Sequence, residues 1–195
     1  MKSLRRLYDW VLGWAETPYG VPALLILAFA ESSIFPIPPD VLLIALAVAA
    51  PTRAFWFAFV CLVGSIAGAF AGYAIGYFAW DSVGQPIIDF YHGQATMDWI
   101  QAQYDARGFW GVLVAAITPI PYKVFTIASG VFKFDLLTFA GASIIGRGIR
   151  FFAVGALIYR YGAPIKSFID KNFNRVALVF TVLLVGGFAL LKWLI

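Results

Sequence analysis

The chain has 195 residues, of which 62% are hydrophobic, 18% are aromatic and only 12% are charged, whereas an average soluble domain has about 25% charged residues. This composition excludes an ordinary soluble globular protein and indicates an integral membrane protein. The net charge of +4 suits basic loops on one side of a membrane better than a nucleic-acid-binding surface, so we expect no nucleic acid as a partner. The single cysteine, Cys61, excludes an intrachain disulfide and a cysteine-cluster metal site.

The first segment, residues 1–17, has an amphipathic pattern. Leu4, Leu7 and Val11 recur at helical spacing, and charged residues such as Arg5 lie on the opposite side of the helix. This pattern is typical of a helix that lies in the membrane interface. The sequence therefore predicts an N-terminal amphipathic helix, which ends before the first long apolar run.

That apolar run, residues 20–50, contains two carboxylates, Glu31 and Asp40, and three prolines near its middle. A continuous helix of this length would measure about 46 Å, against about 30 Å for the hydrocarbon core of a bilayer. Prolines lack the backbone N–H that a helix interior needs. The prolines that break the run are Pro36, Pro38 and Pro39. We therefore predict a re-entrant hairpin with arms at 20–34 and 40–50, and a single proline-kinked spanning helix is the alternative.

The next segment, residues 55–80, is long and apolar enough to span a membrane. It carries four glycines at strict four-residue spacing, namely Gly64, Gly68, Gly72 and Gly76. Small residues at this spacing let helix backbones approach closely. The pattern predicts a helix-packing face, and the alternative is that these glycines line a ligand path.

Residues 81–108 are polar, and the sequence predicts a connector with short interfacial helices here. This segment includes the single histidine, His92.

A second apolar run, residues 109–134, is again broken in its middle, by Pro119 and Pro121. We predict a second re-entrant hairpin here. Two more transmembrane helices are expected, at 136–160 and 175–195.

The tripeptide Pro-Ile-Pro occurs in both broken runs, and each run is followed by a short turn and a small-residue-rich span. If each hairpin returns to its own face, the span between them places the two copies in opposite orientation. The sequence therefore predicts an all-α, polytopic membrane protein of one domain, residues 1–195. Its expected parts are two oppositely oriented re-entrant hairpins in an inverted repeat, an N-terminal amphipathic helix and about three full transmembrane helices.

Positive charge supports this orientation. The inverted arrangement puts most basic residues on one side and the aspartate-rich 81–107 segment on the other, and basic loops are typically cytoplasmic. The residues on the basic side are Lys2, Arg5, Arg6, Arg53, Arg160, Lys166, Lys171 and Arg175.

Five ionisable residues are expected to meet near the middle of the bilayer. They are Glu31, Asp40, Lys123, Arg147 and Arg150. Two carboxylates neutralise at most two of the three cations, which leaves one positive charge for an anion. Arginine matches the oxygens of a phosphate bidentately, so a phosphate group is the favoured ligand. The alternative is a set of buried ion pairs that only fix the hairpins in register.

Three motifs in this order resemble the DedA family, bacterial membrane proteins with the VTT (SNARE-associated) domain: Glu31-x4-Pro-x-Pro-x-Asp40, Thr118-Pro-Ile-Pro-Tyr-Lys123 and Gly146-Arg147-x2-Arg150. The likeness covers about residues 19–161 and is closest to the shorter YqaA-like branch. It implies a multi-pass protein of the bacterial inner membrane that translocates lipids, with Glu31 and Asp40 at essential acidic positions and Arg147 at a basic one. Many members carry arginines around the second-hairpin proline, where this chain has Thr118 and Lys123.

The leading hypothesis is a transporter that flips or scrambles a phosphate-headed lipid, such as a phospholipid or a polyprenyl phosphate, with proton coupling. A proton-coupled small-ion transporter and a non-catalytic structural membrane protein are the alternatives. We expect no enzymatic activity, because a lipid phosphatase would need a membrane-proximal catalytic histidine and His92 lies in a polar loop. No cofactor, metal or catalytic residue is expected. The expected partners are membrane lipids, with an anionic headgroup as substrate, and the sequence is compatible with a homodimer.

Overall fold

The computed structural model describes residues 17–34, 38–80, 82, 94–118, 121–162 and 164. Every regular element among these residues is helical, which confirms the predicted all-α class for this part of the chain. In this described part, two helical segments are long and apolar enough to cross a membrane, Pro51–Ala79 and Leu136–Tyr161. Several predictions fall outside the described residues: the amphipathic helix of 1–17 except Thr17, the span of 175–195, Pro36, Pro119 and His92.

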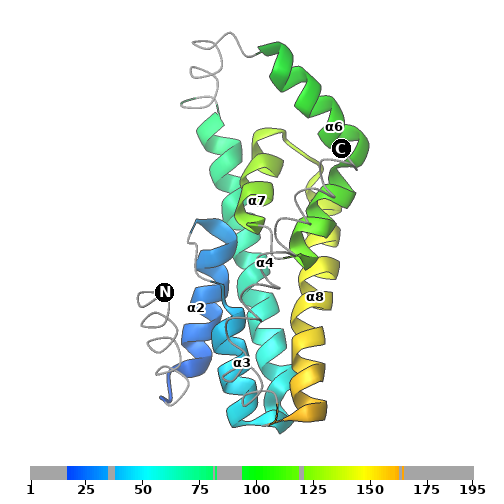
Figure 1. Cartoon of the computed structure of the whole chain (residues 1–195). Coiled ribbons are helices and arrows are strands. Elements are labelled where there is room, and N and C mark those ends of the chain that lie inside the picture. Colours follow the sequence, from blue (N-terminus) through cyan, green and yellow to red (C-terminus); the bar gives the residue numbers. More distant parts are fainter. Residues whose placement is uncertain are drawn as a thin grey trace, which may run out of the picture.

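The first broken run forms two short helices that meet near the middle of the molecule. Helix α2 is Gly20–Ser33 and helix α3 is Asp40–Ala49. Pro39, the residue before α3, has φ −71°, which is the value that the proline ring imposes and that a helix start requires. Figure 1 shows that α2 rises from the lower end and that α3 returns to it. The described residues of this run thus form two separate helices with opposite courses, as the predicted arms require, and re-entrance into a membrane stays a prediction.

Helix α4, Ala54–Ala79, follows the short 3-10 turn η1, Pro51–Arg53, and runs through most of the height of the molecule (Figure 1). The lower half of its glycine face packs against α2. A Cβ added at Gly64 or at Gly68 would overlap a backbone carbonyl oxygen, that of Leu25 or of Phe29 respectively. These glycines therefore allow the backbones of α4 and α2 to touch.

The upper half of the same face packs against the second hairpin. Its arm α7, Tyr122–Val131, lies so close that a Cβ at Gly72 would overlap the hydroxyl of Thr126, and one at Gly76 would overlap the carbonyl oxygen of Ile127. One glycine face of α4 thus packs against an arm of each hairpin.

The other arm of the second hairpin is longer than the sequence predicted. Helix α6 is Gln94–Ile117, so it crosses the predicted boundary between 108 and 109 without interruption. Gly108 does not end the polar segment; a Cβ there would come within 2.8 Å of the Phe134 ring, so this glycine is a point of close packing inside the helix. The predicted connector of 81–108 therefore includes the first turns of α6.

Helix α8, Leu136–Tyr161, returns from the upper end to the lower end and packs against α4, α6 and α3 (Figure 1). Its start is fixed by Asp135, whose Oδ1 accepts a hydrogen bond of 2.8 Å from the backbone N–H of Thr138. The Thr138 hydroxyl donates to the same oxygen, and these two hydrogen bonds hold the pKa of Asp135 below its ordinary value. The helix ends at Gly162, which has a φ of +55° that glycine adopts without a Cβ penalty.

The interior of the described helices contains two apolar clusters, one for each hairpin. The lower cluster joins α2, α3, the lower half of α4 and the end of α8. Its largest members are Leu24, Leu42, Leu43, Phe57, Phe151 and Ile158. The upper cluster joins α6, α7, the start of α8 and Ala69 of α4. Its members include Val112, Ala115, Tyr122, Phe134 and Phe139.

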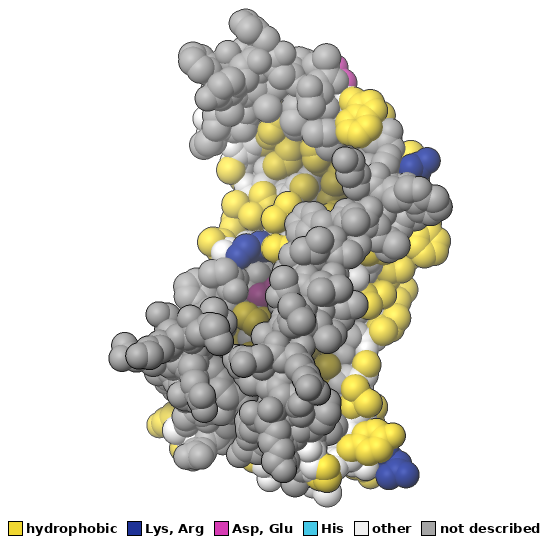
Figure 2. All heavy atoms as spheres, in the orientation of Figure 1, with side chains coloured by type: hydrophobic (Ala, Val, Ile, Leu, Met, Phe, Trp, Pro, Cys, Tyr) yellow, Lys and Arg dark blue, Asp and Glu magenta, His cyan; other side chains and the backbone are white. Residues whose placement is uncertain are grey.

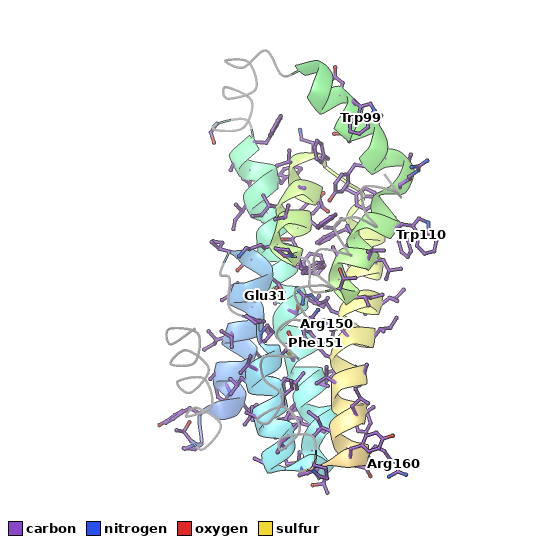
Figure 3. The ribbon with its side chains drawn as sticks, viewed as in Figure 1. Glu31, Trp99, Trp110, Arg150, Phe151 and Arg160 are labelled. Atoms are coloured by element: carbon purple, nitrogen blue, oxygen red, sulfur yellow. The ribbon has the colours of Figure 1, made fainter. Side chains whose placement is uncertain are left out.

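Hydrophobic side chains also cover most of the described outer surface in Figure 2. Phe78 is 76% exposed and Leu137 is 82% exposed. Large apolar surfaces of this kind are rare on soluble monomers and suit contact with lipid. Arg160, in the last turn of α8, lies at the lower end of the molecule (Figure 3), and Arg53 is the last residue of η1.

Candidate functional site

Charged and hydroxyl side chains form a layer between the two apolar clusters. We call it the polar layer and define it by Glu31, Ser32, Asp40, Ser65, Tyr122, Thr126, Ser143, Arg147 and Arg150. Arg147 and Arg150 lie three residues apart on α8 and so share a helix face. Figure 3 shows Glu31 and Arg150 near mid-height, above Phe151 of the lower cluster, whereas Trp99 and Trp110 point outward from α6.

Arg147 pairs with the first hairpin. Its Nη2 lies 2.7 Å from Oε2 of Glu31, and the arginine is only 2% exposed. The Ser32 hydroxyl donates to the same Glu31 oxygen at 3.1 Å and lies 2.7 Å from the Ser65 hydroxyl of α4. The carboxylate thus has a cation and a hydroxyl as partners, as a charge away from water requires.

Arg150 joins the two hairpins to each other. Its Nε and Nη2 donate to the two carboxylate oxygens of Asp40, at 3.1 and 2.8 Å, in the bidentate geometry of a strong arginine–carboxylate pair. Its Nη1 donates to the backbone oxygens of Thr118 at 2.8 Å and Ile117 at 3.3 Å. These carbonyls are at the end of α6, where a helix carries partial negative charge. All three nitrogens of Arg150 therefore have protein partners.

The guanidinium of Arg147 is less completely paired. Its Cζ lies 4.1 Å from the centre of the Tyr122 ring and 5.6 Å from that of Phe151. Its Nε–H is buried and has no hydrogen-bond partner among the described residues. An unpaired buried donor costs about 1–3 kcal/mol. The arginine thus keeps one donor that a ligand oxygen would satisfy.

Two further hydrogen bonds connect the second hairpin to the rest of the layer. The Tyr122 hydroxyl donates to Oγ of Ser143 on α8, at 2.5 Å, and the Thr126 hydroxyl donates to the backbone oxygen of Ser32 at 3.0 Å. Thr118 donates instead to the carbonyl of Val114 in its own helix. The hydroxyls near the breaks mainly satisfy backbone carbonyls, as the freed backbone groups of broken helices require.

Lys123, the third cation of the predicted constellation, is half-buried on α7. Within the described part of the chain its ammonium makes no ion pair, whereas both carboxylates are paired with arginines. The charges of Glu31 and Asp40 are therefore balanced by Arg147 and Arg150, and among the described residues of this region the positive charge of Lys123 is in excess.

The structure thus brings four of the five predicted charged residues into contact, as two ion pairs. It places Lys123 on α7, the helix that begins directly after Pro121. Pro38, Pro39 and Pro121 lie at the helix interruptions. Sequence reasoning did not single out Tyr122, Ser65 or Ser143. The available signal was weak: Ser65 and Ser143 are hydroxyls within apolar spans, and Tyr122 lies between the second Pro-Ile-Pro and Lys123.

Chemically, the polar layer combines two carboxylates with two guanidinium groups. A carboxyl group can bind or release a proton, whereas an arginine stays charged and binds oxyanions. A protonated carboxyl group releases its arginine for another acceptor. The layer can therefore link proton binding to anion binding.

Comparison with known proteins places the chain in a family. The model of the VTT domain matches residues 37–160, which include Asp40, Arg147 and Arg150. An uncharacterized protein of Haemophilus influenzae is 33% identical, and the match covers 98% of this chain and 100% of the relative. An uncharacterized protein of Histophilus somni is 31% identical with the same coverage. No solved structure matches the chain. The family model covers well over half of the sequence, and the chain belongs to the VTT-domain family of membrane proteins, the DedA family.

Proposed function

We propose that this protein is a transporter, not an enzyme, that moves a phosphate-headed lipid across the bacterial inner membrane. The observation that carries the proposal is the polar layer, in which the Nε–H of Arg147, beside the ion pair with Glu31, has no partner among the described residues. A lipid phosphate offers several oxygens to such a planar donor group. The excess charge of Lys123 favours an anion at the same level of the fold.

In this mechanism the two hairpins are re-entrant and their tips meet at the middle of the bilayer. Protonation of Glu31 weakens its hold on Arg147, and the lipid phosphate replaces the carboxylate as the partner of the guanidinium. Loss of the proton restores the Glu31–Arg147 pair and releases the lipid. The proton and the phosphate therefore compete through one arginine, which couples their movements.

The proposed topology predicts which ends of the helices face the cytoplasm. In a Cys61→Ala background, Thr17→Cys and Thr52→Cys should both react with an impermeant thiol reagent from the cytoplasmic side, because α2 and α3 return to the same end. Ser82→Cys, beyond the far end of α4, should react from the opposite side. Reaction of Thr17→Cys and Thr52→Cys from different sides would mean that the first hairpin crosses the membrane.

The proposed function is tested by reconstitution into liposomes with fluorescent phospholipids and polyprenyl phosphates. Wild-type protein should move at least one phosphate-headed lipid, and Glu31→Gln and Asp40→Asn should each lower its rate by more than ten-fold, since they keep size but remove the titrating group. Asp105→Asn, which removes an exposed carboxylate of α6 outside the polar layer, is the control and should act like wild type.

Two results would contradict this function. Liposomes with wild-type protein could show no lipid movement above that of protein-free liposomes across the whole panel. Alternatively, a neutral lipid with the same chains could move as fast as the phosphate-headed one, which would mean that the arginines do not recognise the headgroup. Proton-driven ion flux without lipid movement would favour a small-ion transporter.

A further inference from the structure

We infer that Tyr122 is a positioning residue. Its ring orients the guanidinium of Arg147 so that the Nε–H, which has no partner among the described residues, can meet an anionic headgroup. This inference rests on the proposed function, because it assigns a role in the same site. It concerns a residue whose own chemistry takes no part in proton exchange or in phosphate binding.

The contacts of Arg147 define its orientation from two directions. Glu31 holds one nitrogen, Nη2, at 2.7 Å. Tyr122 covers a face of the guanidinium, with 4.1 Å between Cζ and the ring centre. A cation over an aromatic face within about 6 Å is attracted by the ring, and the attraction is stronger when both groups are removed from water. Both residues are almost fully buried here, at 0% and 2% exposure.

The ring itself is held by the helix that carries the arginine. The Tyr122 hydroxyl donates to Ser143, which lies four residues before Arg147 on α8 and therefore on the same face. The ring spans the distance between these two residues. Because these two polar contacts are both on α8, the ring is held relative to Arg147 as well as packed in the upper cluster.

Tyr122 is also the first residue of α7, directly after Pro121 at the break of the second hairpin. A displacement of this tip would move the ring away from the guanidinium. The orientation of Arg147 therefore depends on the position of the second hairpin, although the carboxylate partner of Arg147 comes from the first.

A packed tyrosine can also have a purely structural role, and the chain offers a half-buried one for comparison. Tyr104 of α6 packs on Phe134 in the upper cluster, and its hydroxyl donates to the carbonyl of Phe125 at 3.2 Å. No contact between Tyr104 and an arginine is present among the described residues. Tyr104 is thus a matched control for the loss of a packed tyrosine ring.

The experiment measures binding of a short-chain phosphatidic acid to purified protein in detergent. Tyr122→Phe keeps the ring and should change the Kd by less than about three-fold, whereas Tyr122→Leu should raise it about ten-fold. In an Arg147→Lys background, where no planar guanidinium remains to be oriented, Tyr122→Leu should change the Kd by less than two-fold. Tyr104→Leu should leave the Kd unchanged in both backgrounds.

The pair of backgrounds separates positioning from packing, because residues that act through each other are non-additive. An equal effect of Tyr122→Leu in both backgrounds, or an equal effect of Tyr104→Leu, would overturn the inference and leave Tyr122 as a packing residue. If Tyr122→Leu does not fold, Tyr122→Met in the same two backgrounds gives the same comparison. Failure of wild-type protein to bind the probe or to move lipid refutes the proposed function instead.

Discussion

Replacement of Gly68 by leucine should abolish the accumulation of folded protein. A Cβ at this position would overlap the carbonyl oxygen of Phe29 and would lie 2.8 Å from its carbonyl carbon and 2.9 Å from its Cα. These are backbone atoms of α2, which cannot rotate away as a side chain can. The two helices would have to separate, and close contact between backbones is what holds small-residue helix pairs together in a membrane.

Gly148→Leu is the matched control, because no atom of another described element lies within 4 Å of a Cβ added at Gly148 on α8. The yield of monodisperse protein, measured by size-exclusion chromatography of a fluorescent fusion, should be near wild type for Gly148→Leu and near zero for Gly68→Leu. Equal yields for the two variants would show that α4 and α2 are not held by backbone contact at Gly68.

The ends of the helices in the first apolar run could be predicted from the sequence. Prolines and the length of an apolar run affect the backbone locally, independently of distant residues. Prolines between Ser33 and Asp40 remove backbone donors whatever the rest of the chain does, so the end of α2 and the start of α3 lie close to the predicted ends of the arms. The regular spacing of Gly64 to Gly76 likewise predicts a close-packed face. It does not say which helices pack there, and the answer, one arm from each hairpin, comes from the structure.

The start of α6 shows where local signals fail. The polar residues before Gly108 suggested a connector, and glycine is unfavourable inside a helix by about 1 kcal/mol relative to alanine. Packing outweighs this preference, because Gly108 lets α6 approach the ring of Phe134, which is distant in sequence. A contact of this kind has no signature in a short window of sequence.

The charged residues of the candidate site were predictable from the sequence, but their pairing and the hydroxyl-bearing residues around them were not. Charged residues in apolar runs are costly, so Glu31, Asp40, Arg147 and Arg150 could be expected to meet. Which carboxylate pairs with which arginine depends on the rotation of α8 relative to the two hairpins. The contact of Tyr122 with Arg147 depends on the same rotation, and aromatic residues are too common in this chain for one of them to be conspicuous.

The bidentate pair of Asp40 and Arg150 gives the second large expected effect. Arg150→Leu should lower the free energy of unfolding by about 3–5 kcal/mol, because it leaves the carboxylate of Asp40 uncompensated away from water. It also removes the donor to the carbonyls of Ile117 and Thr118. Arg160→Leu, at the exposed lower end of α8, removes the same kind of side chain and should have little effect on stability.

The double variant Asp40→Leu with Arg150→Leu separates stability from transport. Apolar replacement of both members of a buried ion pair is often neutral or stabilising, so the double variant should regain most of the stability lost in Arg150→Leu. It should nevertheless remain inactive in liposomes, because a leucine at position 40 cannot exchange a proton and one at position 150 cannot join the hairpin tips by charge. Thermal unfolding in detergent and lipid movement in liposomes measure the two quantities on the same preparation. Recovery of transport together with stability would mean that the pair only fixes the hairpins in register.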